Sequence, residues 1–226
     1  MLRRLSIIVP ILDEALTLPD FLAHLLPYQR VGCEVLLVDG GSHDGSAALA
    51  ECAGFSVVTS PPGRARQMNT GARAAQGEVL LFLHADTRLP EAADNLVHQA
   101  LSDERFVWGR FDVAIEGTSR MLRVVAFLMN HRSRLTGIAT GDQAIFVRRT
   151  VFEAVGEFPD QLLMEDIKLS QRLKHVSPPA CIKSRAITSG RRWETRGVWQ
   201  TIFLMWKLRL AYWFGATPES LAKAYR

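Results

Sequence analysis

The sequence predicts an α/β fold, and three observations support that prediction. Short apolar runs rich in β-branched residues alternate with segments whose apolar residues recur at helical spacing. Acidic residues directly follow three of these runs. Of the 226 residues, 48% are hydrophobic and 22% are charged, which is the composition of a globular chain able to bury a sizeable core.

The first half of the chain reads as a series of strand–helix units. Strands are expected at 5–12, Glu34–Asp39, 55–59 and 78–83, and helices at 17–26, from Ser42 or Asp44 to 53, at 65–75 and at 90–101. Repeated units of this length predict a mostly parallel sheet with right-handed crossovers and flanking helices.

The second half is less regular. Alternation over 106–115 predicts a strand with one exposed face, and a further strand is expected at 143–147. Helices are expected at 120–130, 150–155, 165–172 and 198–214. No segment has the composition of a linker, so we expect a single domain over 1–226.

The net charge of +4 is concentrated near the C-terminus, where eight Lys and Arg residues from Arg185 onward face only Glu194 and Glu219. Such an end could meet phosphates, anionic lipid or nucleic acid, or could simply be a solvated face. The sequence has no nucleic-acid-binding motif, and its aromatic residues are not interleaved through a basic patch, so no nucleic-acid partner is expected.

Cysteine usage and the N-terminus favour a cytoplasmic location. The three cysteines (Cys33, Cys52 and Cys181) are too few and too scattered for a disulfide framework or a zinc site. The apolar run near the N-terminus quickly reaches Asp13 and lacks a signal-peptide pattern. No stretch of about 20 apolar residues suggests a transmembrane helix.

The acidic residues that follow the strands are the central observation. Asp13 and Glu14 follow the first strand, Asp39 ends the second, and Asp86 follows the fourth. Parallel sheets bind ligands beyond the carboxyl ends of their strands. The sequence therefore predicts a polar site at that edge.

Two of these carboxylates have alternative interpretations. Asp86 could be a ligand for Mg²⁺ or Mn²⁺, which commonly use one or two carboxylates plus substrate phosphates, or it could cap the next helix. Asp39 could accept a hydrogen bond from a nucleotide base, or it could serve the turn that follows it. We favour the ligand contact for both.

Three further groups are candidates for the chemistry. Glu165 and Asp166 follow an apolar stretch, where one carboxylate could act as general base, although two acids also suit a helix N-terminus. The clusters Arg64/Arg66 and Arg191–Trp193 offer phosphate contacts and a stacking face, although either could be a surface patch. His84 is either a site contact or a structural hydrogen-bonder.

Taken in order, five segments resemble the family 2 glycosyltransferases of the GT-A fold: SIIVPILDE, EVLLVDGGSHDGS, ARQMNTGARAAQGEVLLFLHADT, LMEDIKLSQRL and, more loosely, SGRRWETRG. The resemblance spans about residues 5–200. It implies inversion at the anomeric carbon and usually a UDP-sugar donor. Within 1–226, it implies a nucleotide-sugar-binding half (1–103), an acceptor and catalytic half (104–193) and a C-terminal helical extension (194–226).

The resemblance also implies roles for individual residues. Asp166 would be the catalytic base with Glu165 beside it, Asp86 would hold the divalent metal, and Gly141 and Asp142 would lie on the acceptor side. The remaining nucleotide-sugar-binding candidates are Pro10, Leu12, Glu14, Asp39, Arg66, His84, Arg192 and Trp193. The acceptor would be a hydroxyl group on an unidentified molecule.

The chain departs from the family pattern at several positions. His84 replaces the first acid of the DxD motif, which puts metal affinity and donor choice in question. Asp13 replaces the usual Asn, Leu12 a frequent aromatic residue, and Gly40 the second acid of the Asp-Asp pair. The His-Ala-Asp variant, the Arg-Arg-Trp segment and the closing LAKAYR resemble a compact bacterial subfamily named for arsenosugar biosynthesis.

The helix expected at 198–214 is strongly apolar but is interrupted by Lys207 and Arg209. It could pack on the domain, form a homodimer contact, or lie in a membrane interface, which would place the protein at the inner face of the membrane and suggest a lipid-linked acceptor. Packing or dimer contact is favoured.

Other functions fit the sequence less well. A nucleotidyltransferase or a Rossmann oxidoreductase would need a glycine-rich loop after a strand, and the first strand ends in PILDE. A membrane-surface or nucleic-acid binder using the basic end remains an alternative, as does a homologue that binds the donor without turnover.

Overall fold

A curved eight-stranded sheet forms the centre of the protein in the computed structural model, which describes residues 4–225 apart from the side chains of Arg192 and Tyr225. The strand order is β3-β2-β1-β4-β7-β6-β8-β5. The strands are β1 Leu5–Ile11, β2 Glu34–Asp39, β3 Ser56–Thr59, β4 Val79–Phe82, β5 Thr87–Arg88, β6 Trp108–Glu116, β7 Phe146–Arg148 and β8 Ala180–Ser189.

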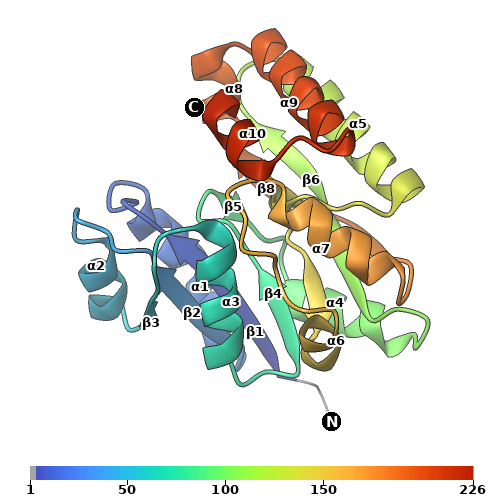
Figure 1. Ribbon diagram of the computed structural model, residues 1–226. Helices are drawn as coiled ribbons and strands as arrows, with labels where there is room; N and C mark the ends of the chain where they lie inside the picture. The colour runs from blue at the N-terminus through green and yellow to red at the C-terminus, as the bar shows by residue number, and fades with distance from the viewer. Residues whose placement is uncertain (1–3, 226) are drawn as a thin grey trace.

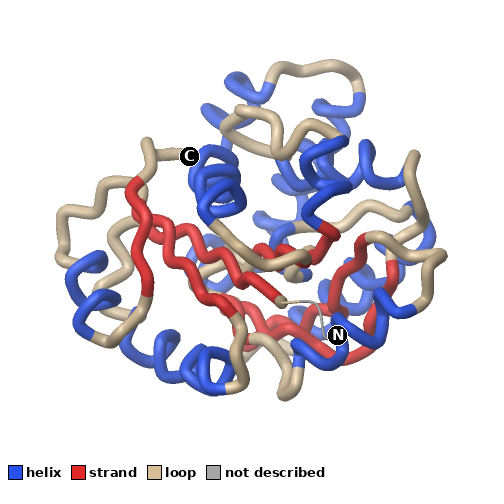
Figure 2. The backbone as a smooth tube through the Cα atoms, turned by 90° about the horizontal axis from the view of Figure 1, so that it is seen from below, coloured by secondary structure: helices blue, strands red, loops and turns tan. Residues whose placement is uncertain are grey.

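Helices lie on both faces of this sheet, which Figure 2 shows as one bent layer. They are α1 Leu18–Arg30, α2 Ser46–Cys52, α3 Arg64–Ala74, α4 Ala93–Ser102, α5 Met121–Thr136, α6 Arg149–Ala154, α7 Glu165–Lys174, α8 Arg191–Arg196, α9 Val198–Trp213 and α10 Pro218–Tyr225, with a 3₁₀ turn, η1, at Gly141–Gln143. The predicted mostly parallel α/β architecture is confirmed: β1, β2, β3 and β4 pair in parallel, while β7 pairs antiparallel with both β4 and β6.

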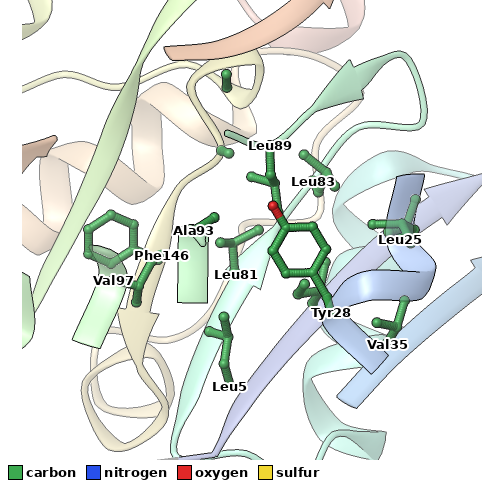
Figure 3. Close-up of a cluster of buried hydrophobic side chains, with 14 of the residues drawn as sticks. Leu5, Leu25, Tyr28, Val35, Leu81, Leu83, Leu89, Ala93, Val97 and Phe146 are labelled. Atoms are coloured by element: carbon green, nitrogen blue, oxygen red, sulfur yellow. The ribbon is translucent and has the colours of Figure 1, made fainter. Parts of the chain in front are cut away.

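Strand alternation decides which helices cover which face of the sheet. Ile7, Val9 and Ile11 of β1 share a buried cluster with residues of α1 and α4, whereas Ile8 packs with residues of α3, α6 and α7 on the opposite face. Figure 3 shows the first cluster, in which Tyr28 of α1 lies beside Leu89. The Tyr28 hydroxyl also donates a hydrogen bond of 2.6 Å to the Pro90 carbonyl.

Several predicted boundaries were wrong. The helix predicted to end at Leu26 continues through Pro27 to Arg30, where the buried Tyr28 anchors its last turn. The strand predicted to have an exposed face, β6, is almost wholly buried, because Trp108 and Phe111 pack into clusters on opposite faces of the sheet and Val113 packs against α5. The sequence interpretation also missed β8, whose exposed residues include Lys183 and Arg185.

The C-terminal helices pack over the carboxyl edge of the sheet. Val198 and Ile202 of α9 pack against a cluster formed by β6 and α5. Leu208 of α9 and Leu221 of α10 form a second cluster with Met164 and Ile167 at the start of α7. Figure 1 shows α9 and α10 above the sheet, with α9 beside α5. Within the described residues, no helix has both the length and the apolar character needed to cross a bilayer.

Candidate active site

A pocket of about 580 Å³ opens at the carboxyl ends of β1 and β4. It is bounded by the loops after these strands, by the starts of α3 and α7, by η1 and by the C-terminal helices. Its lining residues include Pro10, Leu12, Glu14, Arg64, Gln67, His84, Asp86, Gly141, Asp142, Glu165, Asp166, Met205, Arg209 and Ala222. The pocket therefore lies at the edge that the acidic residues predicted.

Hydrogen bonds between the loops after β1 and β2 fix one wall of the pocket. The Asp13 amide donates to Ser42 Oγ, the Glu14 amide to Ser46 Oγ, and the His43 amide to Asp13 Oδ1, at 2.8–3.0 Å. This network holds Asp13 with a positive φ of 52°. The loop after β1 is therefore joined to the loop after β2 by several hydrogen bonds.

Gln67, which the sequence interpretation missed, joins the same two strand ends from α3. Its buried side-chain amide donates to the carbonyls of Ile11 and Val38, both at 2.8 Å. A Cβ added at Gly40 would lie 2.9 Å from the Gln67 side chain. Gly40 therefore leaves room for Gln67 at the position where the family pattern has a second acid.

Asp39 lies outside the pocket lining and is 94% buried in its own turn. Its carboxylate accepts hydrogen bonds from the amides of Gly41 (3.1 Å) and Ser42 (3.2 Å) and from the Ser42 hydroxyl (2.5 Å). These are the turn contacts that were the alternative interpretation of this residue. To reach a nucleotide base, Asp39 would have to exchange some of them.

His84 and η1 form the middle of the pocket. The His84 Nδ1 atom lies 3.5 Å from Asp142 Oδ1. A Cβ at Gly141 would come within 2.2 Å of the imidazole, so only glycine allows η1 to approach His84 this closely. Burial alone would raise the pKa of Asp142, but the hydrogen bond and charge of His84, together with the charges of Arg64 and Arg209, hold that pKa below its usual value.

Asp86 presents an exposed carboxylate to the pocket. Its Oδ1 accepts a hydrogen bond from the Thr87 hydroxyl at 3.2 Å. Among the described residues, no group of three or more potential metal ligands gathers around it. The single carboxylate of Asp86 fits a cation that binds through one carboxylate and through the phosphates of a bound substrate.

Asp166 and Glu165 begin α7 and have different environments. Asp166 lines the pocket, and its two carboxylate oxygens accept hydrogen bonds from the amides of Gly141 (2.9 Å) and Ile167 (2.7 Å). Glu165 is almost fully buried, and its Oε1 lies 3.7 Å from Nη1 of Arg64. Burial raises the pKa of Glu165, and the charge of Asp166 raises it further, while Arg64 opposes both effects.

Glu165→Gln is expected to make the protein more stable than the parent at pH 8, with the difference shrinking towards pH 4. Because the pKa of Glu165 is raised in the folded state, the folded protein holds this proton more tightly than the unfolded chain does. Raising the pH therefore favours unfolding of the parent, and glutamine removes that penalty. Urea unfolding at both pH values checks this, with the exposed Glu153→Gln as control. An equal or larger difference at pH 4 would contradict it.

Arg64 and Arg66, in the first turn of α3, point to opposite sides of the helix. Residues two apart on a helix point about 200° apart. Arg64 lines the pocket, whereas Arg66, which was the predicted ligand contact, forms an exposed ion pair of 2.8 Å with Asp160. Arg64 is therefore the cation that this segment contributes to the pocket.

Trp193, the stacking face that the sequence suggested, does not line the pocket. Trp193 is partly buried and packs against the cluster formed by β6 and α5. The Arg192 side chain lies outside the described part of the structure. The pocket instead receives Arg209 and Met205 of α9 and Ala222 of α10, which the sequence interpretation missed.

Nine predicted site residues thus meet in one pocket. They are Pro10, Leu12, Glu14, His84, Asp86, Gly141, Asp142, Glu165 and Asp166. Asp39, Arg66 and Trp193 do not line it. The roles predicted for all of these residues stay predictions.

The strand order and the position of the pocket at the carboxyl edge of the sheet define the GT-A type of fold. Residues 6–156 match the family model described as glycosyl transferase family 2. Because this match covers more than half of the chain, the protein belongs to glycosyltransferase family 2.

Two curated proteins are similar to the chain in sequence. One is undecaprenyl-phosphate 4-deoxy-4-formamido-L-arabinose transferase of Pseudomonas fluorescens, 32% identical over 66% of this chain and 48% of that protein. The other is the probable glycosyltransferase YdaM of Bacillus subtilis, 26% identical over 88% of this chain and 53% of that protein. The chain thus spans about half the length of these relatives.

Solved structures share the fold at low sequence identity. The mannosyltransferase PcManGT of Pyrobaculum calidifontis, in complex with GDP-Man and Mn²⁺, has a TM-score of 0.66 at 21% identity, over 93% of this chain and 61% of that one. Glucosyl-3-phosphoglycerate synthase of Mycobacterium tuberculosis, in complex with Mg²⁺ and UDP, has a TM-score of 0.62 at 18% identity, over 82% and 70%.

Proposed function

We propose that the protein is an inverting glycosyltransferase that moves a sugar from a nucleotide-diphosphate sugar to an acceptor hydroxyl group. The observation that carries this proposal is the meeting of Asp86, the Glu165–Asp166 pair and the Gly141–Asp142 turn in one pocket. In the N-terminal part, 1–103, the pocket wall formed by Pro10, Leu12 and Glu14 would receive the donor. Residues 104–193 would supply the base and the acceptor side, and 194–226 would close the pocket.

Asp166 is the proposed general base. Inversion requires the acceptor oxygen to attack the anomeric carbon from the face opposite the departing diphosphate, and a base must take the hydroxyl proton. The amides of Gly141 and Ile167 orient the Asp166 carboxylate. Glu165 is less suited to this role, because its carboxyl group is buried and lies against Arg64.

Asp86 is the proposed ligand of a divalent cation, Mg²⁺ or Mn²⁺. When bound, such a cation would neutralise the charge that develops on the leaving diphosphate. Its exposed carboxylate suits this role, and the two solved structures described above contain Mn²⁺ or Mg²⁺ with a nucleotide. Because His84 interacts with Asp142, we do not assign it as a second ligand.

A UDP-sugar is the proposed donor. The mycobacterial synthase was solved with UDP, and a third protein of this fold, S. aureus TarS 1-349, was solved with UDP-GlcNAc. TarS has a TM-score of 0.64 at 15% identity, over 82% of this chain and 58% of that one. PcManGT, in contrast, was solved with GDP-Man, so the base must be tested directly.

A binding screen with UDP, GDP, CDP and TDP, each with and without Mn²⁺, tests the proposed function. A ligand that binds only the folded protein raises its melting temperature by mass action. We expect one of the four nucleoside diphosphates, UDP under our proposal, to raise the melting temperature only when Mn²⁺ is present. No stabilisation by any of the four, with or without metal, would overturn the proposal.

The exposed side of α9 favours contact with an anionic membrane surface. Trp199, Phe203, Trp206, Leu210 and Trp213 are each 55–78% exposed, and their spacing of four and three residues places them on one side of the helix. We call this set the aromatic face. Helices α5 and α9 contain no acidic residue, and Arg123 and Lys207 on them are exposed.

Aromatic residues together with an excess of cations suit the headgroup region of an anionic bilayer. The Pseudomonas relative is named for a lipid-linked substrate, undecaprenyl phosphate, and a lipid-linked acceptor would place this chain's substrate at the same surface. We therefore propose that the protein binds peripherally to the inner face of the membrane.

The double variant Phe203→Ser/Trp206→Ser is expected to reduce binding to vesicles of phosphatidylcholine with about one-third phosphatidylglycerol by at least about ten-fold. Co-sedimentation measures this binding. Leu16→Ser is the matched control, because Leu16 is 93% exposed but lies on the loop after β1. If the parent fails to bind vesicles and instead forms a dimer that the double variant dissolves, the aromatic face is a homodimer contact.

A further inference from the structure

Two arginines from distant parts of the chain lie together at the C-terminal side of the pocket. Arg209 of α9 lines the pocket, and Arg132 of α5 is close enough for their charges to repel each other. The Nε atom of Arg209 and the Nε and Nη2 atoms of Arg132 are shielded from solvent, and none of them has a hydrogen-bond partner within the described residues. Buried donors without partners are costly, so such a pair needs an explanation.

Nearby carboxylates do not fully account for these charges. The charge of Asp166 acts favourably on both arginines, and that of Asp142 acts on Arg209, but no ion pair with either arginine is formed within the described residues. Asp112, the buried carboxylate on β6, is engaged by Arg110 and, at 2.6 Å, by Arg134. Each of its two oxygens is thus held by another arginine, and within the described residues it forms no ion pair with Arg132 or Arg209.

The pKa values of Arg132 and Arg209 reflect how these side chains are placed. Burial and the repulsion from Arg209 lower the pKa of Arg132 to about 10, and burial lowers the pKa of Arg209 as well. Both arginines are partly buried, and charges shielded from solvent are normally paired, so an anion entering the pocket beside Arg209 would relieve the repulsion. Guanidinium groups suit phosphate and carboxylate oxygens in particular.

We propose that Arg209, supported by Arg132, binds an oxyanion, either a phosphate or a carboxylate, that the acceptor carries next to its reacting hydroxyl group. This assignment to the acceptor rests on the proposed function. Asp166, the proposed base, and Asp142 of the acceptor side are both close enough for their charges to act on Arg209. An anion held by Arg209 would therefore bring the acceptor's hydroxyl group towards the base. The acceptor would thus be an anionic molecule.

Calorimetric titration of the full chain with inorganic phosphate and, separately, with acetate tests this proposal. Each titration is made without nucleotide and again with saturating UDP and Mg²⁺, which occupy the donor site. The variants are Arg209→Met, which keeps an unbranched apolar side chain but not the guanidinium group, and Arg209→Lys, which keeps the charge. Arg185→Met on β8 is the control, because Arg185 is exposed and lies outside the pocket.

We expect at least one of the two anions to bind the UDP-loaded parent, and the anion that binds more tightly indicates whether the acceptor carries phosphate or carboxylate. Arg209→Met should weaken that binding by at least about ten-fold, Arg209→Lys by less, and Arg185→Met not at all. The affinity for UDP should stay the same in all variants. Melting temperatures of the variants confirm that they are folded.

Two results would overturn the proposal. One is anion binding that is absent from the parent or unchanged in Arg209→Met. The other is an anion that displaces UDP, together with weaker UDP binding in Arg209→Met, which would assign Arg209 to the donor diphosphate. Failure of the proposed function looks different, because no nucleotide would then bind the parent, and the titration without nucleotide would still report on the arginine pair.

Discussion

Replacing Asp166 with asparagine is expected to reduce sugar transfer by about 10²–10⁴-fold, the usual contribution of a general base. Asparagine has nearly the same shape and can still accept the hydrogen bond from the Gly141 amide, but it cannot take the acceptor's proton. The affinity for the nucleotide should therefore be unchanged. Release of the nucleoside diphosphate measures turnover, and calorimetry measures binding.

Asp160→Asn is the control for this experiment, because Asp160 is exposed and its only role in the described contacts is the ion pair with Arg66. It should keep the activity of the parent. If Asp166→Asn retains most of its activity, Asp166 is not the base. Glu165 would then be tested next as the adjacent carboxylate.

Replacing Asp86 with alanine is expected to remove the metal dependence of donor binding and to weaken binding of the nucleoside diphosphate with Mn²⁺ by about 10- to 100-fold, the range for loss of a charged contact. Asp86 is the exposed carboxylate after β4, and in the described structure it belongs to no group of three or more potential metal ligands. Removing the metal with a chelator should weaken binding to the parent and leave the variant's binding unchanged.

Asp20→Ala, an exposed change in the first turn of α1, should bind nucleotide and metal as the parent does. The decisive comparison is the parent with and without metal. Equal affinity in both conditions would show that Asp86 does not act through a cation, and that the His-Ala-Asp variant binds its donor without one.

Local sequence patterns predicted the N-terminal half well, because each element there depends on neighbours along the chain. The run EVLLVD forms β2 over the predicted Glu34–Asp39. Its continuous apolar residues suit a strand that is buried on both faces of the sheet. Both β1 and α3 lie within about one residue of their predicted ends. The carboxyl-edge pocket follows from the parallel order of these strands.

Contacts between distant segments explain what the sequence interpretation missed. The strand β8 carries Lys183 and Arg185 and does not look apolar, yet it pairs in parallel with β6. The sequence interpretation predicted that Arg66, rather than Arg64, contacts the ligand. The answer depends on which side of α3 faces the pocket, and Arg66 instead pairs with Asp160, in the loop after α6. Arg209 reached the pocket only because α9 folds over the start of α7.

The sequence by itself determined the fold class through the order of its strands, and the family through five segments that occur in order. Of the carboxylates in the pocket, it indicated Glu14 and Asp86 by their places after strands, and Asp142, Glu165 and Asp166 through the family resemblance. The tertiary structure decided which cations join those carboxylates and how each carboxylate is held. It engages Asp39 in its own turn, buries Glu165, leaves Asp166 in the pocket and places Arg209 there too. These outcomes depend on packing between segments far apart in the chain, which no local pattern encodes.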